Sequence, residues 1–378
     1  MAKKVRLGLI GLGYIGKIHL LGARSAPLCL DAPPVLAQYV SLLTTHPEQN
    51  RTYAESLGFE TVHSDLDKFL DQGLDGVDIC TPNSMHFSQA KAALERGIPV
   101  YCEKPMTMDA KEAKALVDLA GARCVANQVA LTYRFHPSSL RAKAYVESGI
   151  IGDIIALRGH LFHSSYLDKD RPTSWRLQNS LSGGGALSDL GIHILDQMLY
   201  LAGGVSSLRA FTRTFVADRP VRKGSGDRIP VDVDDWALVE MQFASGASGT
   251  LEASRVYSGR DGSSIEVFGT KGSLVIAGGD SAWPTIHVFS DGTASRGKPV
   301  ELDATKREIL SLHPSAKMTV GGMVDAHMTS VLRFGLSISR KEATYPGAPD
   351  FRAALRCQEV LDAAYLSAEQ DGERVQVS

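Results

Sequence analysis

The sequence lacks three features: long hydrophobic runs, an excess of charge of one sign, and closely paired cysteines. No stretch reaches the roughly 18 consecutive apolar residues of a membrane-spanning helix. The 40 Lys and Arg residues nearly balance the 42 Asp and Glu residues, and the formal net charge is -2. We therefore expect neither nucleic acid nor an anionic membrane as a partner.

The cysteines are few, and they are distributed in a way that argues against a disulfide framework. There are 5 of them, an odd number, and no two form a Cys-x-x-Cys pair. We expect buried, reduced thiols in a cytoplasmic protein. The first residues, MAKKVRLGLIGLG, resemble a signal peptide, but Arg6 and the glycines interrupt the apolar run.

What is present is the composition of an ordinary globular protein with room for two cores. The chain has 378 residues, of which 44% are hydrophobic and 22% are charged. Up to residue 127, short β-rich runs alternate with helical patterns, which is typical of a parallel sheet covered on both faces. We expect a doubly wound, dinucleotide-binding Rossmann domain over 1–127. Its strands are expected at VRLGLI, LAQYVSLL, GVDICTP, PVYCEKP and RCVANQVAL.

A change of pattern marks a second domain, which we expect over 128–378. After a helix beginning near Pro137, residues 237–256 and 263–278 predict two antiparallel hairpins. Helical periodicity returns at 323–338 and 350–370, and we expect these two helices to cover the new sheet. The predicted fold is α/β, with a C-terminal α+β domain whose open sheet is mainly antiparallel and serves substrate binding and oligomerisation.

A glycine motif follows the first predicted strand. Gly11, Gly13 and Gly16 stand in GLGYIG, directly before a helical stretch. In this context the first glycine permits a tight turn, the second lets the backbone approach a pyrophosphate, and the third permits close helix packing. We expect this turn, with Tyr14 and Ile15, to bind a dinucleotide; the alternative is a tight turn without a ligand.

The end of the second strand bears on the choice of coenzyme. An acidic residue there usually binds the ribose of NAD, but Asp31 lies in a predicted turn, and Thr44, Thr45 and His46 occupy the strand end. A carboxylate would repel a 2′-phosphate, whereas these residues, with Arg51, can accept one. The sequence therefore leans slightly towards NADP, and NAD remains the alternative.

Two further segments carry chemistry. Lys104, in CEKP, ends the fifth predicted strand, and this is the sheet edge at which open α/β sheets bind ligands. Asp189 and His193, in SDLGIHILD, are spaced to share one face of a helix. The alternatives are a surface lysine, and a helix-capping aspartate with an unrelated histidine.

Together with TPNSMH at 81–86, these motifs resemble the Gfo/Idh/MocA family of sugar and cyclitol dehydrogenases. The segments TSWRLQNSLSGGGALSDLGIH, VDVDD and GTKGS most resemble its levoglucosan and inositol dehydrogenase branch. The likeness covers nearly the whole chain. It implies oxidation or reduction of a ring secondary alcohol, with Lys104 and His193 as catalytic groups and Asp189 as the partner of His193. A cis peptide before Pro105 is common in the family.

The resemblance also implies binding residues. An imidazole suits the removal of a hydroxyl proton, and an ammonium group stabilises the alkoxide that develops. Aromatic faces and guanidinium groups suit a sugar ring. The further cofactor-binding candidates are Thr81, Pro82, Asn83, His86, Glu103 and Lys104. The substrate-binding candidates are Tyr133, with the adjacent Arg134, and Trp175, Arg176, Asp189, His193 and Arg255.

No metal site is expected. His160 and His163 stand three apart on a predicted strand and therefore point to opposite faces, and the aspartates of VDVDD, Asp232 to Asp235, are interpreted as a turn or edge feature. Two alternatives to a dehydrogenase stay open: a cofactor-binding regulator without catalysis, and a redox-assisted enzyme that cleaves glycosides. The resemblance implies a homodimer or homotetramer formed through the open sheet, with a small carbohydrate or cyclitol as substrate.

Overall fold

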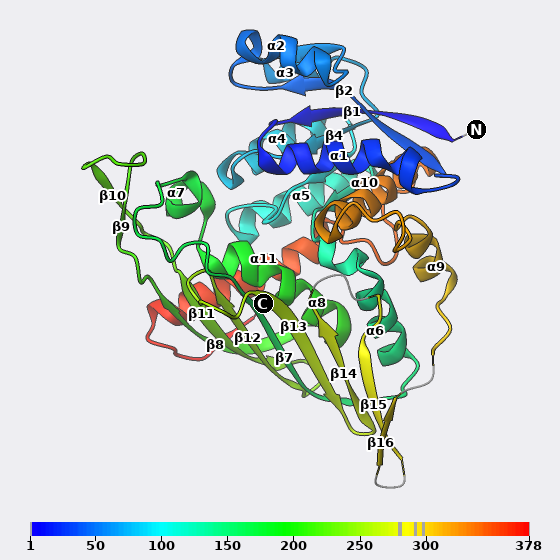
Figure 1. Ribbon diagram of the computed structural model, residues 1–378, viewed down its shortest axis with the longest axis vertical. Coiled ribbons are helices and arrows are strands. Elements are labelled where there is room, and N and C mark those ends of the chain that lie inside the picture. Colours follow the sequence, from blue (N-terminus) through cyan, green and yellow to red (C-terminus); the bar gives the residue numbers. More distant parts are fainter. Residues whose placement is uncertain (1, 279–281, 291–292, 297–298, 378) are drawn as a thin grey trace. The chain divides into compact units, whose positions relative to one another are not determined.

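The computed structural model describes residues 2–278, 282–290, 293–296 and 299–377 (Figure 1). The chain forms two compact units. Unit 1 comprises residues 1–107, 111–135 and 304–355, and unit 2 comprises residues 108–110, 136–303 and 356–378. The sequence predicts one division at 127/128, whereas here a C-terminal segment packs with the N-terminal unit. Periodicity identifies a helix without showing which sheet it covers.

Unit 1 is built on a parallel sheet of six strands in the order β3-β2-β1-β4-β5-β6. All five neighbouring pairs are parallel. The expected doubly wound sheet is thus confirmed, but the sequence missed β3, a strand of three residues that is too short to show a period. The strands are β1 (Lys3–Ile10), β2 (Val35–Leu43), β3 (Thr61–His63), β4 (Gly76–Ile79), β5 (Val100–Cys102) and β6 (Asn127–Val129).

The helices of unit 1 follow the strands, except for two that arrive from residues 304–355. The sequence predicts that α10 covers the sheet of unit 2. This prediction was wrong, because α10 packs against α1 and β2 of unit 1 (Figure 1). Its buried side chains include Met328, Val331 and Phe334, which join the core around β1 and β2. The helices are α1 (Tyr14–Cys29), α2 (Pro47–Ser56), α3 (Leu66–Leu70), η1 (Asn83–Met85), α4 (His86–Glu95), α5 (Ala110–Arg123), η2 (Thr132–Phe135), α9 (Ala304–Ser311) and α10 (Gly322–Arg340).

Unit 2 is built on a nine-stranded sheet in the order β16-β15-β14-β13-β7-β12-β11-β8-β17. Among the described strands of this sheet, only β7 and β12 pair in parallel, which confirms a mainly antiparallel sheet. Both predicted hairpins are present, as β11–β12 and β13–β14. The strands of unit 2, two of them in a separate small sheet (β9–β10), are β7 (Ile154–Phe162), β8 (Val205–Arg213), β9 (Asp218–Pro220), β10 (Arg228–Pro230), β11 (Trp236–Phe243), β12 (Ser248–Ser254), β13 (Gly262–Gly269), β14 (Gly272–Ala277), β15 (Thr285–Ser290), β16 (Thr293–Arg296) and β17 (Val375–Gln376).

Helix α11 supports this sheet, as the sequence predicts. Ser367 on α11 accepts a hydrogen bond from the backbone N–H of Ala210 in β8 at 2.9 Å. The helices of unit 2 are α6 (Pro137–Glu147), η3 (Trp175–Leu177), α7 (Asn179–Ser182), the π-helical turn η4 (Leu187–Gly191), α8 (Ile192–Ala202) and α11 (Phe351–Glu369), the last of which begins in unit 1.

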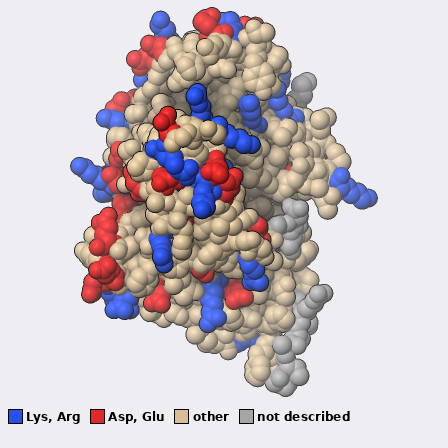
Figure 2. Space-filling model, turned by 60° about the vertical axis from the view of Figure 1, so that its left-hand side comes forward, with Lys and Arg blue, Asp and Glu red and all other residues tan. Residues whose placement is uncertain are grey.

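Three general properties can be checked against the sequence. All five cysteines are free, but only Cys80, Cys102 and Cys357 are buried: Cys29 is half-buried and Cys124 is exposed, so the prediction of burial was wrong for these two. Within the described residues, no helix is both long enough and apolar enough to cross a membrane. Figure 2 shows positive and negative side chains interspersed on the visible face.

Candidate active site

The glycine turn lies between β1 and α1, and each glycine has its own constraint. Gly11 has φ +93°, a conformation that side chains rarely adopt. A Cβ on Gly16 would lie 2.3 Å from the carbonyl oxygen of Gly11, so this position admits only glycine. A Cβ on Gly13 would meet nothing within 4 Å, so the space beside it is open.

The start of α1 offers unpaired donors beside that space. Gly13 is the N-cap residue of α1, and no side chain caps the helix. The first N–H groups of a helix have no partner within it and favour an anion. Tyr14 is exposed, whereas Ile15 packs against the core. These features fit a dinucleotide pyrophosphate.

The loops after β4 and β5 lie at the same edge of the sheet and are tied together by His86. Its two ring nitrogens lie 2.9 Å from the carbonyl oxygens of Pro105 and Thr81. Burial lowers the pKa of His86. The Thr81 hydroxyl donates to Gln89 at 2.7 Å, and Asn83 is buried. The structure thus brings Thr81 and His86, together with Pro82 between them, to the end of β5.

Lys104 is the second residue after β5, behind Glu103. Its side chain is half-buried, and its backbone N–H donates to the carboxylate of Glu103 at 3.1 Å. The peptide bond between Lys104 and Pro105 is cis. Because β1, β4 and β5 are parallel, the glycine turn and the residues that follow β4 and β5 stand along one carboxyl edge of the sheet.

The end of β2 is where the sequence places it. Thr44 is half-buried and accepts a hydrogen bond from Asn50 at 3.2 Å, while Thr45 and His46 are exposed. Arg51, expected to be available for a phosphate, pairs instead with Glu48 at 2.9 Å. A carboxylate, that of Glu48, therefore follows the strand end after all, five residues after Leu43.

In unit 2, Asp189 and His193 lie on one continuous helical segment, but its first part is a π-helical turn. Asp189 falls within η4 and His193 within α8; both are half-buried. A π-turn inside a helix often accompanies a functional site. The sequence predicts a regular helix here, whereas the observed π-turn makes the helix wider at Asp189. Apolar periodicity does not reveal such a turn.

A buried carboxylate holds the beginning of this helical segment. Asp234 accepts the N–H groups of Gly185 at 2.8 Å and Leu187 at 2.9 Å, and the hydroxyl of Tyr365 at 2.9 Å. A Cβ on Gly185 would lie 2.0 Å from the Asp234 carbonyl oxygen, so only glycine allows the two backbone segments to approach this closely. Burial raises the pKa of Asp234. The interpretation of VDVDD as a turn or edge feature missed this anchoring role.

The substrate-binding candidates have different surroundings. Trp175 and Arg176 are half-buried in η3, with the guanidinium carbon of Arg176 4.3 Å from the centre of the Trp175 ring. Tyr133 lies in η2 of unit 1 and is half-buried, beside the buried Arg134. Their contact with a substrate stays a prediction.

Arg255 is enclosed more fully than expected. It is 1% exposed, donates to the carbonyl of Asp234 at 2.7 Å, and lies 3.7 Å from the Asp235 carboxylate. These contacts assign it a structural part in holding the 234–235 segment. A direct contact with a substrate stays a prediction.

Sequence reasoning missed His163, which follows β7. Burial lowers its pKa, while the charge of Asp189 raises it and that of Arg255 lowers it again. These three residues therefore share one neighbourhood in unit 2. The sequence offered only the pattern HLFH, which was considered for metal binding alone.

Two groups in unit 1 have the composition of a metal site: His19, Glu103 and His327, and His19, Asp78 and Cys80. All are buried. The sequence signal for them was available, because Asp78 is a charged residue inside an apolar strand and His19 stands three residues after Gly16, on the buried side of α1.

Comparison with known proteins places these features in one family. An oxidoreductase-family model with an NAD-binding Rossmann fold matches residues 5–131, and a GFO/IDH/MocA C-terminal domain model matches residues 139–275. Levoglucosan dehydrogenase of Pseudarthrobacter phenanthrenivorans is 36% identical over 286 residues, which is 72% of this chain and 73% of the relative. The scyllo-inositol 2-dehydrogenase (NAD(+)) of Bacillus subtilis is 31% identical, over 73% of this chain and 75% of the relative.

Solved structures agree with this. A levoglucosan dehydrogenase in complex with NADH and levoglucosan superposes with a TM-score of 0.88 at 31% identity, covering 100% of both chains. The expected family resemblance and fold class are confirmed.

Proposed function

Because the chain belongs to the Gfo/Idh/MocA family of oxidoreductases, we propose that it oxidises a ring secondary alcohol of an anhydrosugar and passes the hydride to NAD. Levoglucosan is the first candidate substrate, because the relative with 36% identity is a levoglucosan dehydrogenase. Inositols are the second candidate, because a relative with 31% identity is an inositol dehydrogenase. One observation carries the proposal: the chain retains Lys104 at the sheet edge together with Asp189 and His193 on one helical segment. A regulator that only binds cofactor needs none of them.

The glycine turn and its surroundings fit the coenzyme. Gly13 leaves open space, and the uncapped start of α1 presents N–H groups to an anion. Thr44 to His46 would lie at the ribose, and Thr81 to His86, with Glu103 and Lys104, would lie towards the nicotinamide. When bound, NAD supplies the hydride acceptor.

The side chains of this protein then manage the proton and the developing charge. His193 accepts the hydroxyl proton, because an imidazole titrates near neutral pH. Asp189 orients His193 or holds a neighbouring hydroxyl group. The ammonium of Lys104 stabilises the alkoxide as the carbon–hydrogen bond breaks. This assignment requires Lys104 and His193 to act on the same substrate carbon.

The remaining candidates would recognise the sugar. Tyr133 and Trp175 offer aromatic faces for the ring C–H groups, and Arg176 offers donors for hydroxyl oxygens. His163 joins this set because it shares electrostatic surroundings with Asp189. Arg255 stays a candidate for direct contact and also supports the segment that contains Asp234 and Asp235.

For the coenzyme we propose NAD, against the slight lean of the sequence towards NADP. Arg51, the cation that a 2′-phosphate would need, is already paired with Glu48. NADH is also the coenzyme in the complexes of the similar levoglucosan dehydrogenase. Titration of the protein with NADH and NADPH, followed by fluorescence, tests this choice, and tighter NADPH binding would reverse it.

We further propose a homodimer or homotetramer, formed through the outer face of the unit 2 sheet. Trp236 and Leu238 are half-buried and Phe268 is exposed, although all three lie on strands of this sheet. Sedimentation of the protein measures the assembly, and a monomer at micromolar concentration would contradict it. The free cysteines favour a cytoplasmic location.

The test of the reaction is a substrate panel. We expect levoglucosan and NAD to give NADH, with weaker turnover of inositols. Glucoside cleavage without net NADH would favour the redox-assisted enzyme instead. Coenzyme binding without turnover of any substrate would favour the regulator.

A further inference from the structure

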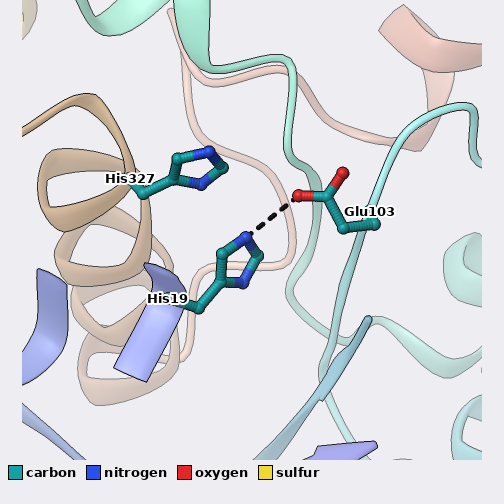
Figure 3. Close-up of side chains that lie close together, drawn as sticks. All are labelled: His19, Glu103 and His327. Carbon is teal, nitrogen blue, oxygen red and sulfur yellow. Dashed lines mark hydrogen bonds and ion pairs between the residues drawn. The ribbon is translucent and has the colours of Figure 1, made fainter. Parts of the chain in front are cut away.

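A buried ionic cluster lies in unit 1 beneath the sheet edge that carries Lys104. His19 of α1 sits between two carboxylates: its Nδ1 lies 2.8 Å from Asp78 Oδ2, and its Nε2 lies 3.0 Å from Glu103 Oε1. His19 and Asp78 are 0% exposed and Glu103 is 6% exposed. Figure 3 shows His19 pointing to Glu103, with His327 beside both.

This geometry makes His19 a cation. A carboxylate accepts hydrogen bonds, so both ring nitrogens must donate. Burial lowers the pKa of His19, but the Asp78 carboxylate and Cys80 together outweigh burial and raise the pKa well above its ordinary value. Burial would raise the pKa of Glu103, yet the hydrogen bond and charge of His19, with the charges of His327 and Lys104, lower that pKa to about 2.

The second oxygen of Glu103 extends the cluster to the proposed catalytic lysine. Glu103 Oε2 accepts the backbone N–H of Lys104 at 3.1 Å, and the N–H of Glu103 donates to the carbonyl of Ile79 in β4 at 2.9 Å. The carboxylate therefore connects the cationic ring on α1 to the backbone of Lys104.

A metal site is the other reading of His19, Glu103 and His327, since their ligand atoms lie within 4.8 Å of one another. Both nitrogens of His19, however, already stand at hydrogen-bonding distance from carboxylates. A metal on Nε2 would have to replace the proton shared with Glu103. The geometry therefore favours an ion pair.

We propose that His19 is a positioning residue: through Glu103 it holds the backbone of Lys104 in place for catalysis. The inference rests on the proposed function, because it acts through Lys104. It explains why a fully buried histidine stands on the helix that the glycine turn begins. Loss of the ring would leave Glu103 without its cation and loosen the attachment of Lys104.

The test compares His19→Ala and His19→Gln with Tyr39→Phe as the matched control. Tyr39 is buried and donates to the other carboxylate, Asp78, so its variant disturbs the cluster away from Glu103. We expect kcat for levoglucosan to fall roughly 10- to 100-fold in His19→Ala, as for a slightly misplaced catalytic group. His19→Gln, which keeps one donor, should recover part of this loss, and the NADH Kd should stay within about threefold.

Tyr39→Phe should lower the Tm by about as much as His19→Ala does, but it should leave kcat within about twofold of wild type. Equal kcat values in His19→Ala and Tyr39→Phe, or a kcat loss that follows Tm across all three variants, would overturn the inference. So would a bound transition metal whose removal by a chelator abolishes turnover.

A double-mutant cycle with Lys104→Ala gives a second readout, measured in single turnovers. If His19 acts through Lys104, adding His19→Ala to Lys104→Ala should cause little further loss. If the losses of the two single variants multiply in the double variant, the proposal is contradicted. If turnover of Lys104→Ala is undetectable, the comparison of kcat between His19→Ala and Tyr39→Phe decides. A wild-type protein without any turnover would instead refute the proposed function.

Discussion

The glycine turn of unit 1 and the Asp189–His193 segment of unit 2 are held in place by different means. The turn is held by backbone contacts: Gly16 approaches the Gly11 carbonyl within the motif, and the N–H of Gly11 donates to the carbonyl of Leu43 at 3.0 Å. The helical segment is held by the side chain of Asp234, 49 residues from Gly185 in the sequence. The glycine motif can be recognised from local spacing, whereas the position of the Asp189–His193 segment depends on a tertiary contact.

This difference predicts where substitutions act on chemistry and where they act on structure. The largest effect is expected at the reacting groups themselves. Lys104→Ala and His193→Ala should each lower kcat by about 10²- to 10⁴-fold, because each removes charge stabilisation or proton transfer from the transition state. Steady-state kinetics with levoglucosan and NAD measure this.

The control is Lys114→Ala, which removes an exposed lysine that pairs with Asp118 on its own helix. It should leave kcat unchanged. NADH affinity should stay within about threefold in all three variants. Near wild-type turnover in Lys104→Ala and His193→Ala would refute their catalytic roles.

The next effect concerns the anchor of the helical segment. Asp234→Ala leaves two buried N–H groups without their acceptor and should cost about 2–5 kcal/mol of stability, with a loss of kcat because Asp189 shifts. Calorimetry and kinetics measure the two effects. Asp232→Ala, which loses one exposed hydrogen bond to Asn179, should cost about 1 kcal/mol or less. Equal losses of stability in Asp234→Ala and Asp232→Ala would contradict the larger contribution assigned to the buried carboxylate.

Acid should affect the ionic cluster of unit 1. The folded-state pKa of Glu103 is lowered to about 2, so its contribution to stability is complete above its ordinary value near 4.5 and is lost as the pH falls towards 2. A Glu103→Gln variant should therefore show a shallower decline of Tm over that pH window. Parallel Tm curves for the two proteins would contradict the charged pair.

Within the glycine turn, one substitution should affect coenzyme binding and another should affect stability. Gly13→Ala should fold with an unchanged Tm but bind NADH more weakly, since its Cβ enters only the open space. Gly16→Ala should lower the Tm, because its Cβ meets the Gly11 carbonyl at 2.3 Å. Thermal denaturation and NADH titration separate the two, with Gly121→Ala on α5 as the unhindered control. A lowered Tm in Gly13→Ala would place protein atoms in the space assigned to the coenzyme.

The smallest effect is expected at the coenzyme ribose. Glu48→Gln releases Arg51 from its ion pair and removes a negative charge, so NADPH affinity should rise several-fold while NADH affinity changes little. Titration with both coenzymes measures the ratio. An unchanged ratio would mean that Arg51 lies out of reach of a 2′-phosphate.

Sequence reasoning was most successful where function depends on local spacing. The glycine motif, the strand end at Leu43 and the two hairpins follow from period, turn residues and spacing, whereas the fifth strand ends at Cys102, before the predicted end in CEKP. What it missed depends on distant partners. The position of α10, the burial of Arg255 beside Asp235, and the capping role of Asp234 are all set by residues far apart in the chain.

The central claim is that Lys104 and His193 serve one hydride transfer from a sugar carbon to NAD. Single-turnover formation of NADH from levoglucosan, followed in wild type, in each single variant and in the double variant, tests it most directly. The account predicts rapid NADH formation in wild type and a double-variant loss smaller than the product of the single losses. Losses that multiply independently, or unchanged NADH formation in either single variant, would contradict it.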